Sequence, residues 1–138
     1  MTACPNIHNL HRPGAWNLNG LRVLVVEDSW LVASAVKHLL ETWGADVSGP
    51  VATAADAARS ISERTIDVAL VDIGLRGGQM AFDLIDRLHD RGIRTVVVTG
   101  YADVPSIEGK VAVVLKKPVR ADVLLQSLRP AGQSKELQ

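Results

Sequence analysis

The chain alternates short apolar runs with longer stretches in which apolar residues recur every three or four positions. The strongest runs are continuous rather than alternating, which indicates strands covered on both faces and therefore a parallel sheet. Most of the runs are rich in Val and Ile, residues that favour strands. The five predicted strands are Leu21–Val26, Asp46–Ser48, Asp67–Val71, Arg94–Val98 and Val111–Leu115.

Four of the stretches between and after these runs have helical spacing. In the first, Leu31, Ala35, Leu39 and Trp43 are expected to line one buried face, and Gly44 follows as a helix C-cap. The other helices are marked by Thr53 and Asp56 at the start of the second, by Gly92 after the third (residues 81–88), and by the apolar positions of residues 121–128 in the last.

A further helix is expected between the last two strands, but its sequence is poor in helical signals. Tyr101–Gly109 is short, contains Pro105 and Gly109, and has few apolar residues. We therefore expect a short or poorly formed fourth helix there, with high mobility. The alternation of strands and helices predicts a doubly wound α/β fold of three layers.

The 138 residues correspond to one domain. Residues 1–20 contain Pro, Gly and Asn without a sustained period, so they are expected to form an irregular leader. Residues 21–129 form the predicted folded domain, and residues 130–138 form a polar tail.

Composition narrows the classes of partner. The 15 basic and 15 acidic residues cancel, so no basic excess indicates nucleic acid or a membrane surface as a partner. Cys4 is the only cysteine, which excludes an intrachain disulfide, and with His8 and His11 it lacks the ligands of a zinc site. Neither a membrane-spanning run nor a secretory signal is present, so a cytoplasmic protein is expected.

Polar side chains follow four of the five predicted strands. Glu27 and Asp28 follow the first, Asp72 follows the third, Thr99 and Gly100 follow the fourth, and Lys117 comes shortly after the fifth. The carboxyl ends of parallel strands lie at one edge of the sheet, where ligands of open α/β sheets bind. We therefore expect three carboxylates, one hydroxyl and one ammonium group to lie close together.

Electrostatics indicates what such a cluster holds. Two carboxylates about 4 Å apart repel each other by roughly 4 kcal/mol at an effective dielectric constant near 20. Such a pair is stable only if one group is protonated or a cation lies between them. Oxygen ligands with few carboxylates and a phosphate favour Mg²⁺. A carboxylate beside a bound cation can act as a nucleophile and form an aspartyl phosphate.

These motifs together resemble the receiver domain of two-component response regulators. The resemblance covers about Leu21 to Leu128 and rests on Val23-Leu-Val-Val-Glu-Asp28, Val71-Asp72, Val98-Thr99-Gly100 and Lys117-Pro118. It implies a flavodoxin-like sheet of five parallel strands in the order 2-1-3-4-5. It is closest to a subset of stand-alone receivers with a Phe-Ala-Thr-Gly motif, although Val97 and Val98 replace Phe and Ala here.

The resemblance assigns a role to each site residue. Asp72 would be the phosphoacceptor, and Asp28 and Asp72 would bind Mg²⁺ directly, Glu27 through a water molecule and Gly74 through its backbone carbonyl. Thr99, with the adjacent Gly100, and Lys117 would contact the phosphoryl group, and the Lys117–Pro118 bond would be cis. In many receivers an aromatic residue lies three positions before the lysine. Here that position is Val114, which leaves Tyr101 as the nearby aromatic residue that could act as a relay.

Each of these residues also has a simpler interpretation. Glu27 and Asp28 could be a solvated helix start, Thr99 could cap the next turn, and Lys117 could be a surface lysine before a proline. Trp30 begins the first helix, which in receivers belongs to the kinase-docking face. It is a candidate partner anchor, and packing against the leader is the alternative.

The predicted function is that of a single-domain receiver that signals by protein–protein interaction or by phosphorelay. A sensor histidine kinase or a phosphotransfer protein would phosphorylate Asp72, and an unknown downstream protein would receive the signal, since the chain contains no DNA-binding domain. The alternative is a receiver-like binding module that acts without phosphorylation. An enzyme is not expected beyond slow autodephosphorylation, because Gly74 occupies the position where haloacid-dehalogenase-type phosphatases need a second Asp. A flavin carrier is disfavoured because Glu27 and Asp28 would repel its phosphate.

Overall fold

The computed structural model describes residues 17–74, 79–100, 107 and 109–129. Its sheet has five parallel strands in the order β2-β1-β3-β4-β5, as the resemblance implied. The strands are β1 (Arg22–Val26), β2 (Asp46–Val51), β3 (Val68–Asp72), β4 (Arg94–Thr99) and β5 (Val113–Lys116).

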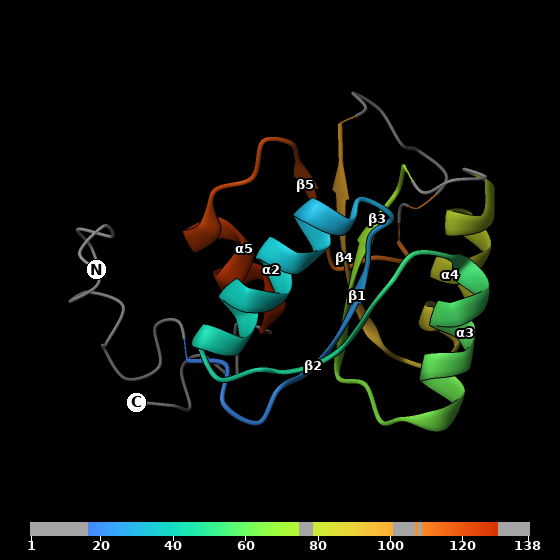
Figure 1. The fold of residues 1–138 in the computed structure, drawn as a ribbon. Coiled ribbons are helices and arrows are strands. Elements are labelled where there is room, and N and C mark those ends of the chain that lie inside the picture. Colours follow the sequence, from blue (N-terminus) through green and yellow to red (C-terminus); the bar gives the residue numbers. More distant parts are fainter. Residues whose placement is uncertain (1–16, 75–78, 101–106, 108, 130–138) are drawn as a thin grey trace.

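Two helices cover each face of this sheet, which confirms the three-layer fold (Figure 1). One face carries α2 (Trp30–Thr42) and α5 (Ala121–Leu128), and the other carries α3 (Ala54–Glu63) and α4 (Gln79–Asp90). The fourth of these described helices, α5, is short, with 8 residues. None of the described helices is long and apolar enough to cross a membrane.

The poor helix expected over Tyr101–Gly109 lies almost entirely outside the described residues. Within that stretch the structure describes Ile107 and Gly109, and neither belongs to an α-helix. Ile107 is buried in the core under α4. The connection between β4 and β5 therefore contributes an apolar side chain to the fold.

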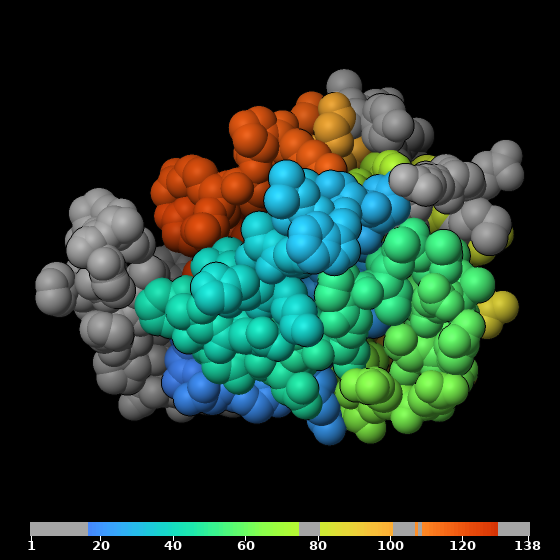
Figure 2. Space-filling model, viewed as in Figure 1, coloured from blue at the N-terminus to red at the C-terminus, as the bar shows by residue number. Residues whose placement is uncertain are grey.

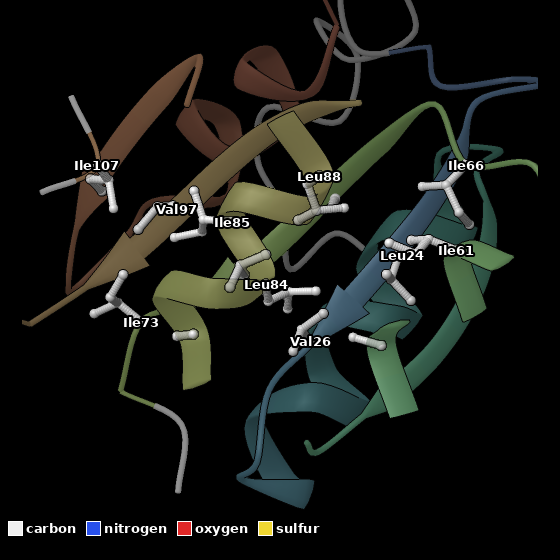
Figure 3. Packing of buried hydrophobic residues seen from close by; sticks show 14 residues of the cluster. Leu24, Val26, Ile61, Ile66, Ile73, Leu84, Ile85, Leu88, Val97 and Ile107 are labelled. Carbon is white, nitrogen blue, oxygen red and sulfur yellow. The ribbon is translucent and has the colours of Figure 1, made fainter. Parts of the chain in front are cut away.

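The core between the sheet and the α3–α4 layer is built from long aliphatic side chains (Figure 3). Leu24 and Val26 project from β1 toward Ile61 of α3. Farther along the sheet, Leu84, Ile85 and Leu88 of α4 pack over Val97 of β4, with Ile73 and Ile107 nearby. Eight of the fourteen buried residues of this cluster are leucine or isoleucine.

The core on the opposite face includes the end of the predicted leader. Leu18 is only 1% exposed and packs with the apolar residues of β1, α2 and α5. Its backbone N–H donates a hydrogen bond of 2.8 Å to the carbonyl oxygen of Trp43. The last leader residues therefore belong to the packed domain.

The second strand is longer than predicted. The predicted strand ends at Ser48, but β2 continues through Gly49 and Pro50 to Val51. The pairing of Leu24 with Ser48 is followed by the pairing of Val26 with Val51, so two residues of β2 lie opposite one residue of β1. This arrangement is a β-bulge, and the two residues of β2 in it are Gly49 and Pro50.

The predicted apolar face of α2 is partly wrong. Leu31 and Ala35 are exposed, Leu39 and Trp43 are half-buried, and the fully buried residues of this helix are Ala33 and Leu40. Nearly every position from Trp30 to Val36 is apolar, so spacing alone could not select the stripe that faces the sheet. The helix leaves an apolar surface at its start as a result.

Gly44 ends α2, as predicted. Its φ of +99° lies in the left-handed region, and its N–H donates to the carbonyl oxygen of Glu41 at 3.0 Å. A Cβ atom at this position would lie 1.9 Å from Oδ1 of Asn19. Glycine is therefore required both by the backbone angle and by the close approach of the segment that precedes β1.

Candidate functional site

All the predicted site residues that the structure describes lie at the carboxyl edge of the sheet. Glu27 and Asp28 directly follow β1, and Asp72 and Thr99 are the last residues of β3 and β4. Lys117 directly follows β5. Because β1, β3, β4 and β5 are neighbours in that order, their ends bring these residues to one edge. The side chain of Asp72 is almost fully buried, whereas Glu27 and Asp28 are half-buried.

The three predicted carboxylates form one cluster. One oxygen from each of Glu27, Asp28 and Asp72 lies within 4.8 Å of the others. At such separations unscreened carboxylates repel strongly, so the cluster needs a proton or a cation. An octahedral cation with ligands at about 2.1 Å places its ligand oxygens about 3 to 4 Å apart, which small side-chain movements reach from here. The residues therefore fit a hard divalent cation held by oxygen ligands.

Two donors hold the carboxylate of Asp72. Oδ1 accepts a hydrogen bond of 2.9 Å from the backbone N–H of Gly74, and Oδ2 lies 3.0 Å from Nζ of Lys117. Both bonds fix the orientation of a carboxylate whose side chain is only 8% exposed. Lys117 is itself held in place, since its backbone N–H donates to the carbonyl oxygen of Thr99 at 2.8 Å. The bond between Lys117 and Pro118 is cis, as the resemblance implied.

The pKa values of the clustered groups are shifted in different directions. Burial, followed by the hydrogen bond and the charge of Asp72, raises the pKa of Glu27 to about 7. Burial alone would raise the pKa of Asp72, but the hydrogen bonds from Gly74, Glu27 and Lys117 outweigh it and lower that pKa. Burial would lower the pKa of Lys117. The hydrogen bond to Asp72 and the charge of that carboxylate outweigh burial, so the pKa of the ammonium group is raised. Without a metal ion, Glu27 is thus the group that carries the shared proton near neutral pH.

Thr99 and Gly100 form the end of β4. Thr99 is buried, with 1% of its surface exposed. Val98, the residue just before Thr99, pairs with Asp72 of β3. Gly100 is exposed, and no atom lies within 4 Å of the place where its Cβ would be. Tyr101, the predicted relay, lies outside the described residues.

Ser29 is a site residue that sequence reasoning missed. Its backbone N–H donates to Oε2 of Glu27 at 3.0 Å, and its Oγ accepts from the N–H of Val32 at 3.4 Å as the N-cap of α2. The signal was present, because Ser directly before a run of helix-forming residues is a typical N-cap. Ser29 thereby joins the acidic loop to the start of α2 and fixes the carboxylate of Glu27.

An apolar surface begins beside this loop. Trp30 is 76% exposed and Leu31 is 74% exposed, and Val32 is also exposed. In Figure 2 the light-blue start of α2 stands at the surface between the orange α5 segment and green α3. The alternative, in which Trp30 packs against the leader, involves residues 1–16, which lie outside the described residues. On β5, Val114 is also exposed.

Solved structures with this fold are known. A CheY-like response regulator receiver domain protein from Methanospirillum hungatei JF-1 is 27% identical, with a TM-score of 0.71 over 84% of this chain and 98% of that chain. The signal receiver domain of a modulated diguanylate cyclase from Desulfovibrio desulfuricans G20 is 32% identical, with a TM-score of 0.68 over 77% of this chain and 88% of that chain. A search of curated proteins finds no match.

A third structure was determined with groups bound at its own site. It is a response regulator protein from Burkholderia pseudomallei with a phosphorylated aspartic acid, a calcium ion and citrate. It is 24% identical, with a TM-score of 0.71 over 84% of this chain and 70% of that chain, and so demonstrates similarity of fold.

A family comparison covers most of the chain, including every predicted site residue. The family model of the response regulator receiver domain matches residues 23–129. This range begins in β1 and ends just after α5, so it contains the whole sheet apart from Arg22. The chain therefore belongs to the response regulator receiver domain family.

Proposed function

We propose that Asp72 accepts a phosphoryl group from a sensor histidine kinase or a phosphotransfer protein in a Mg²⁺-dependent reaction. The observation that carries the proposal is the position of Asp72, whose carboxylate is fixed by Lys117 and Gly74 beside two further carboxylates. The modified protein then passes the signal on through protein–protein interaction or by phosphorelay. The family assignment supports a phosphoacceptor role.

In the proposed reaction, an oxygen of Asp72 attacks the phosphorus atom of a phosphohistidine. An O–P bond forms, the P–N bond breaks, and the imidazole of the donor leaves with the electron pair of that bond. The lowered pKa of Asp72 keeps the nucleophile ionised at neutral pH. Its two hydrogen bonds hold it in one orientation, which reduces the entropy cost of reaching the transition state.

Asp28, Asp72 and Glu27 are the residues that would hold Mg²⁺, Glu27 through a water molecule, with the backbone carbonyl of Gly74 as a further ligand. The ion would supply positive charge that offsets repulsion between the carboxylates and the phosphoryl oxygens. The calcium ion and phosphorylated aspartic acid of the Burkholderia pseudomallei protein support this assignment. Glu27 would release its proton when the ion binds, because the positive charge of the ion would oppose the burial and the Asp72 carboxylate that raise its pKa to about 7.

Lys117 and Thr99 would contact the transferred phosphoryl group. Phosphorylation adds about −1.5 to −2 charges near neutral pH, and the ammonium group of Lys117 already lies beside the acceptor. The hydroxyl of Thr99 would donate a hydrogen bond to a phosphoryl oxygen, with Gly100 leaving room for it. Movement of Thr99 toward the phosphoryl group would change the surface near β5, with Tyr101 as the proposed relay.

The proposal does not include turnover of an external substrate. Autodephosphorylation would be slow at most, and Gly74 stands two residues after Asp72, where phosphatases of the haloacid-dehalogenase type need a second Asp. Proteins are the proposed partners, without nucleic acid or membrane, and the proposed location is the cytoplasm. The equal numbers of acidic and basic residues support this choice of partner.

Trp30 is proposed as an anchor for the phosphodonor protein. It is the most exposed large apolar side chain in the described part of the chain, and it lies two residues after Asp28. Trp residues in the centre of an interface often contribute 2 kcal/mol or more, about thirtyfold in affinity. Trp30→Ala should therefore slow transfer from a histidine kinase at subsaturating concentration by more than about tenfold. Phosphorylation by acetyl phosphate should be unchanged, and loss of both rates would instead indicate a damaged site.

The central test is labelling of the purified protein with acetyl phosphate and Mg²⁺. The wild type should gain one phosphoryl group by mass spectrometry, and Asp72→Asn should gain none. Asp67→Asn is a matched control, because Asp67 lies just before the same strand at its opposite end. Labelling of Asp72→Asn, or none of the wild type, would contradict the proposal. If the wild type is not labelled and Asp72→Asn still binds its partner as the wild type does, the protein would instead be a binding module that acts without phosphorylation.

A further inference from the structure

A cavity of about 510 Å³ lies beneath the proposed phosphorylation site, on the side of the sheet that carries α2 and α5. Glu27, Asp72 and Lys117 lie at one end of it. The rest of its wall is apolar and comes from three strands and both helices. The residues that matter for the argument are Val25, Val32, Val36, Leu70, Val98 and Leu124.

Short side chains explain why this space is not filled. Four of these six wall residues are valines, whose side chains end one carbon earlier than those of leucine and isoleucine. On the opposite face of the same sheet, the buried residues include Ile61 of α3 and Leu84, Ile85 and Leu88 of α4 (Figure 3). The space opens to the surface, so a molecule from solution can reach these apolar side chains.

The size and the wall indicate the chemistry of that occupant. Ligand pockets typically measure about 300 to 1,000 Å³ and combine an apolar lining with a few polar groups that fix orientation. An ionised ligand is disfavoured among these valines and leucines, because burying a charge away from a counter-charge is costly. At the polar end, both a cation (Lys117) and carboxylates (Glu27 and Asp72) are available as hydrogen-bond partners.

We propose that this cavity binds a small, uncharged, largely apolar molecule whose single polar group points toward Lys117 and Glu27. Binding at this site goes beyond the proposed phosphotransfer and does not require it. The apolar body of the molecule contacts Val36 of α2, Val98 of β4 and Leu124 of α5. This would make the domain responsive to a metabolite as well as to a phosphodonor.

Occupancy of the cavity is coupled to the state of Asp72. Lys117 contacts Asp72 at 3.0 Å, and the next two residues, Pro118 and Val119, form part of the cavity wall. A phosphoryl group that repositions Lys117 therefore moves the wall that the ligand touches. Coupling between two sites is reciprocal, so the ligand changes the affinity for a phosphoryl mimic by the same factor.

The test uses 1-naphthalenemethanol, an uncharged bicyclic aromatic molecule with one hydroxyl group. Titration into the ¹³C-methyl-labelled full chain should give saturable shifts of the Val36 and Val98 methyl resonances, with a Kd below about 1 mM. The anion 1-naphthalenesulfonate should bind at least tenfold more weakly. Absence of saturable shifts in the wild type, or equal affinity for the anion, would overturn the proposal.

A pair of variants on one helix locates the binding. Val36→Phe adds a ring inside the cavity and should weaken 1-naphthalenemethanol binding at least tenfold. Leu31→Phe adds a ring on the exposed side of α2 and should leave the Kd unchanged. If Val36→Phe does not fold by circular dichroism, Val119→Phe fills the cavity from the opposite wall. Equal effects of the two α2 variants would place binding on the surface and overturn the assignment.

A last measurement tests the coupling separately from the phosphotransfer proposal. Mg²⁺ with beryllofluoride, a phosphoryl mimic, should change the Kd of 1-naphthalenemethanol at least threefold in the wild type and leave it unchanged in Asp72→Asn. An unchanged Kd in wild type that binds beryllofluoride would overturn the coupling. Failure of the wild type to label with acetyl phosphate would count against the proposed function alone, because the cavity titration needs no phosphorylation.

Discussion

Nζ of Lys117 lies 3.0 Å from Oδ2 of Asp72, although the two residues are 45 positions apart in the chain and end strands separated by β4. This contact offsets the negative charge of the acidic cluster, and it places an ammonium group at the point where phosphoryl charge would develop. Lys117→Met removes the charge and keeps the apolar stem. We expect phosphorylation by acetyl phosphate to slow on the order of 10²-fold, as when one electrostatic donor is lost.

Lys117→Met should not weaken the binding of Mg²⁺, although it slows phosphorylation. Removing a cation from beside three carboxylates should leave Mg²⁺ binding as strong or make it stronger. Lys116→Met is the matched control, because Lys116 is exposed and no described hydrogen bond or ion pair joins it to Asp72. Calorimetric Mg²⁺ titrations and timed labelling check both effects. Equal labelling rates in Lys117→Met and the wild type would contradict the assigned role.

Glu27 gives the cluster a pH dependence near neutrality. Its pKa of about 7 in the folded protein exceeds the ordinary value of 4.5, so the metal-free fold retains a proton that the unfolded chain releases. This contribution to stability is fully present below pH 4.5 and is lost as the pH rises through about 7. Mg²⁺ takes the place of the proton, so it should raise the Tm more at pH 8 than at pH 6.

The same linkage predicts the pH profile of metal binding. Below about pH 7 the affinity for Mg²⁺ should fall by up to about tenfold per pH unit, because binding displaces one proton. Glu27→Gln should flatten this profile while Ser29→Ala, which retains the carboxylate, should keep it. Calorimetry in two buffers of different ionisation enthalpy measures the released proton directly. A wild-type affinity independent of pH between 6 and 8 would contradict this account.

Much of the site was predictable because of where its residues stand in the chain. Asp72, Thr99 and the Glu27-Asp28 pair each lie at the end of a continuous apolar run, and the topology of a parallel sheet brings such ends to one edge. Lys117 was identified by the Lys-Pro pair. These inferences needed only the order of the strands, and no side-chain geometry.

Other features depend on packing that the sequence does not encode locally. The apolar residues at the start of α2 fit several stripes, so the exposure of Leu31 could not be derived from spacing. The continuation of β2 to Val51 depends on a bulge opposite β1. The cavity beside Val36 results from side chains of five elements, and the proton on Glu27 depends on its burial beside Asp72. Each of these requires the assembled structure.

Asp67 stabilises the opposite edge of the sheet. Its Oδ2 accepts hydrogen bonds from the backbone N–H of Arg22 at 2.8 Å and from Nε of Arg22 at 3.1 Å, and Oδ1 accepts from the same guanidinium at 3.1 Å. Asp67→Ala should lower the free energy of unfolding by about 1 kcal/mol, a modest value because the pair is partly exposed. Urea denaturation at pH 7 measures the change, with unaltered Mg²⁺ binding as the control.

The pair also predicts a loss of stability in acid. The guanidinium of Arg22 lowers the pKa of Asp67 below its ordinary value of 3.8, so its contribution is present above that value and is lost as the pH falls through the lowered pKa. The difference in stability between wild type and Asp67→Ala should therefore shrink as the pH is lowered from 5 toward 2. A difference that stays constant over this range would show that the ion pair is not its source.

Gly44 and Gly92 allow the cost of a close approach to be separated from the cost of a backbone angle. Both have φ in the left-handed region, +99° and +71°, but a Cβ at Gly92 would meet nothing within 4 Å, whereas at Gly44 it would lie 1.9 Å from Oδ1 of Asn19. Gly92→Ala should destabilise the protein by about 1 kcal/mol, because alanine disfavours the positive φ of this residue. Gly44→Ala should cost about 2 to 4 kcal/mol, because the side chain of Asn19 must also move aside and its Cα lies 3.1 Å from the added Cβ. Asn19→Ala should recover part of the Gly44→Ala loss and none of the Gly92→Ala loss, as urea denaturation of the single and double variants would measure. Equal losses in the two glycine variants would mean that Asn19 moves aside without cost, and that the angle alone requires glycine at the end of α2.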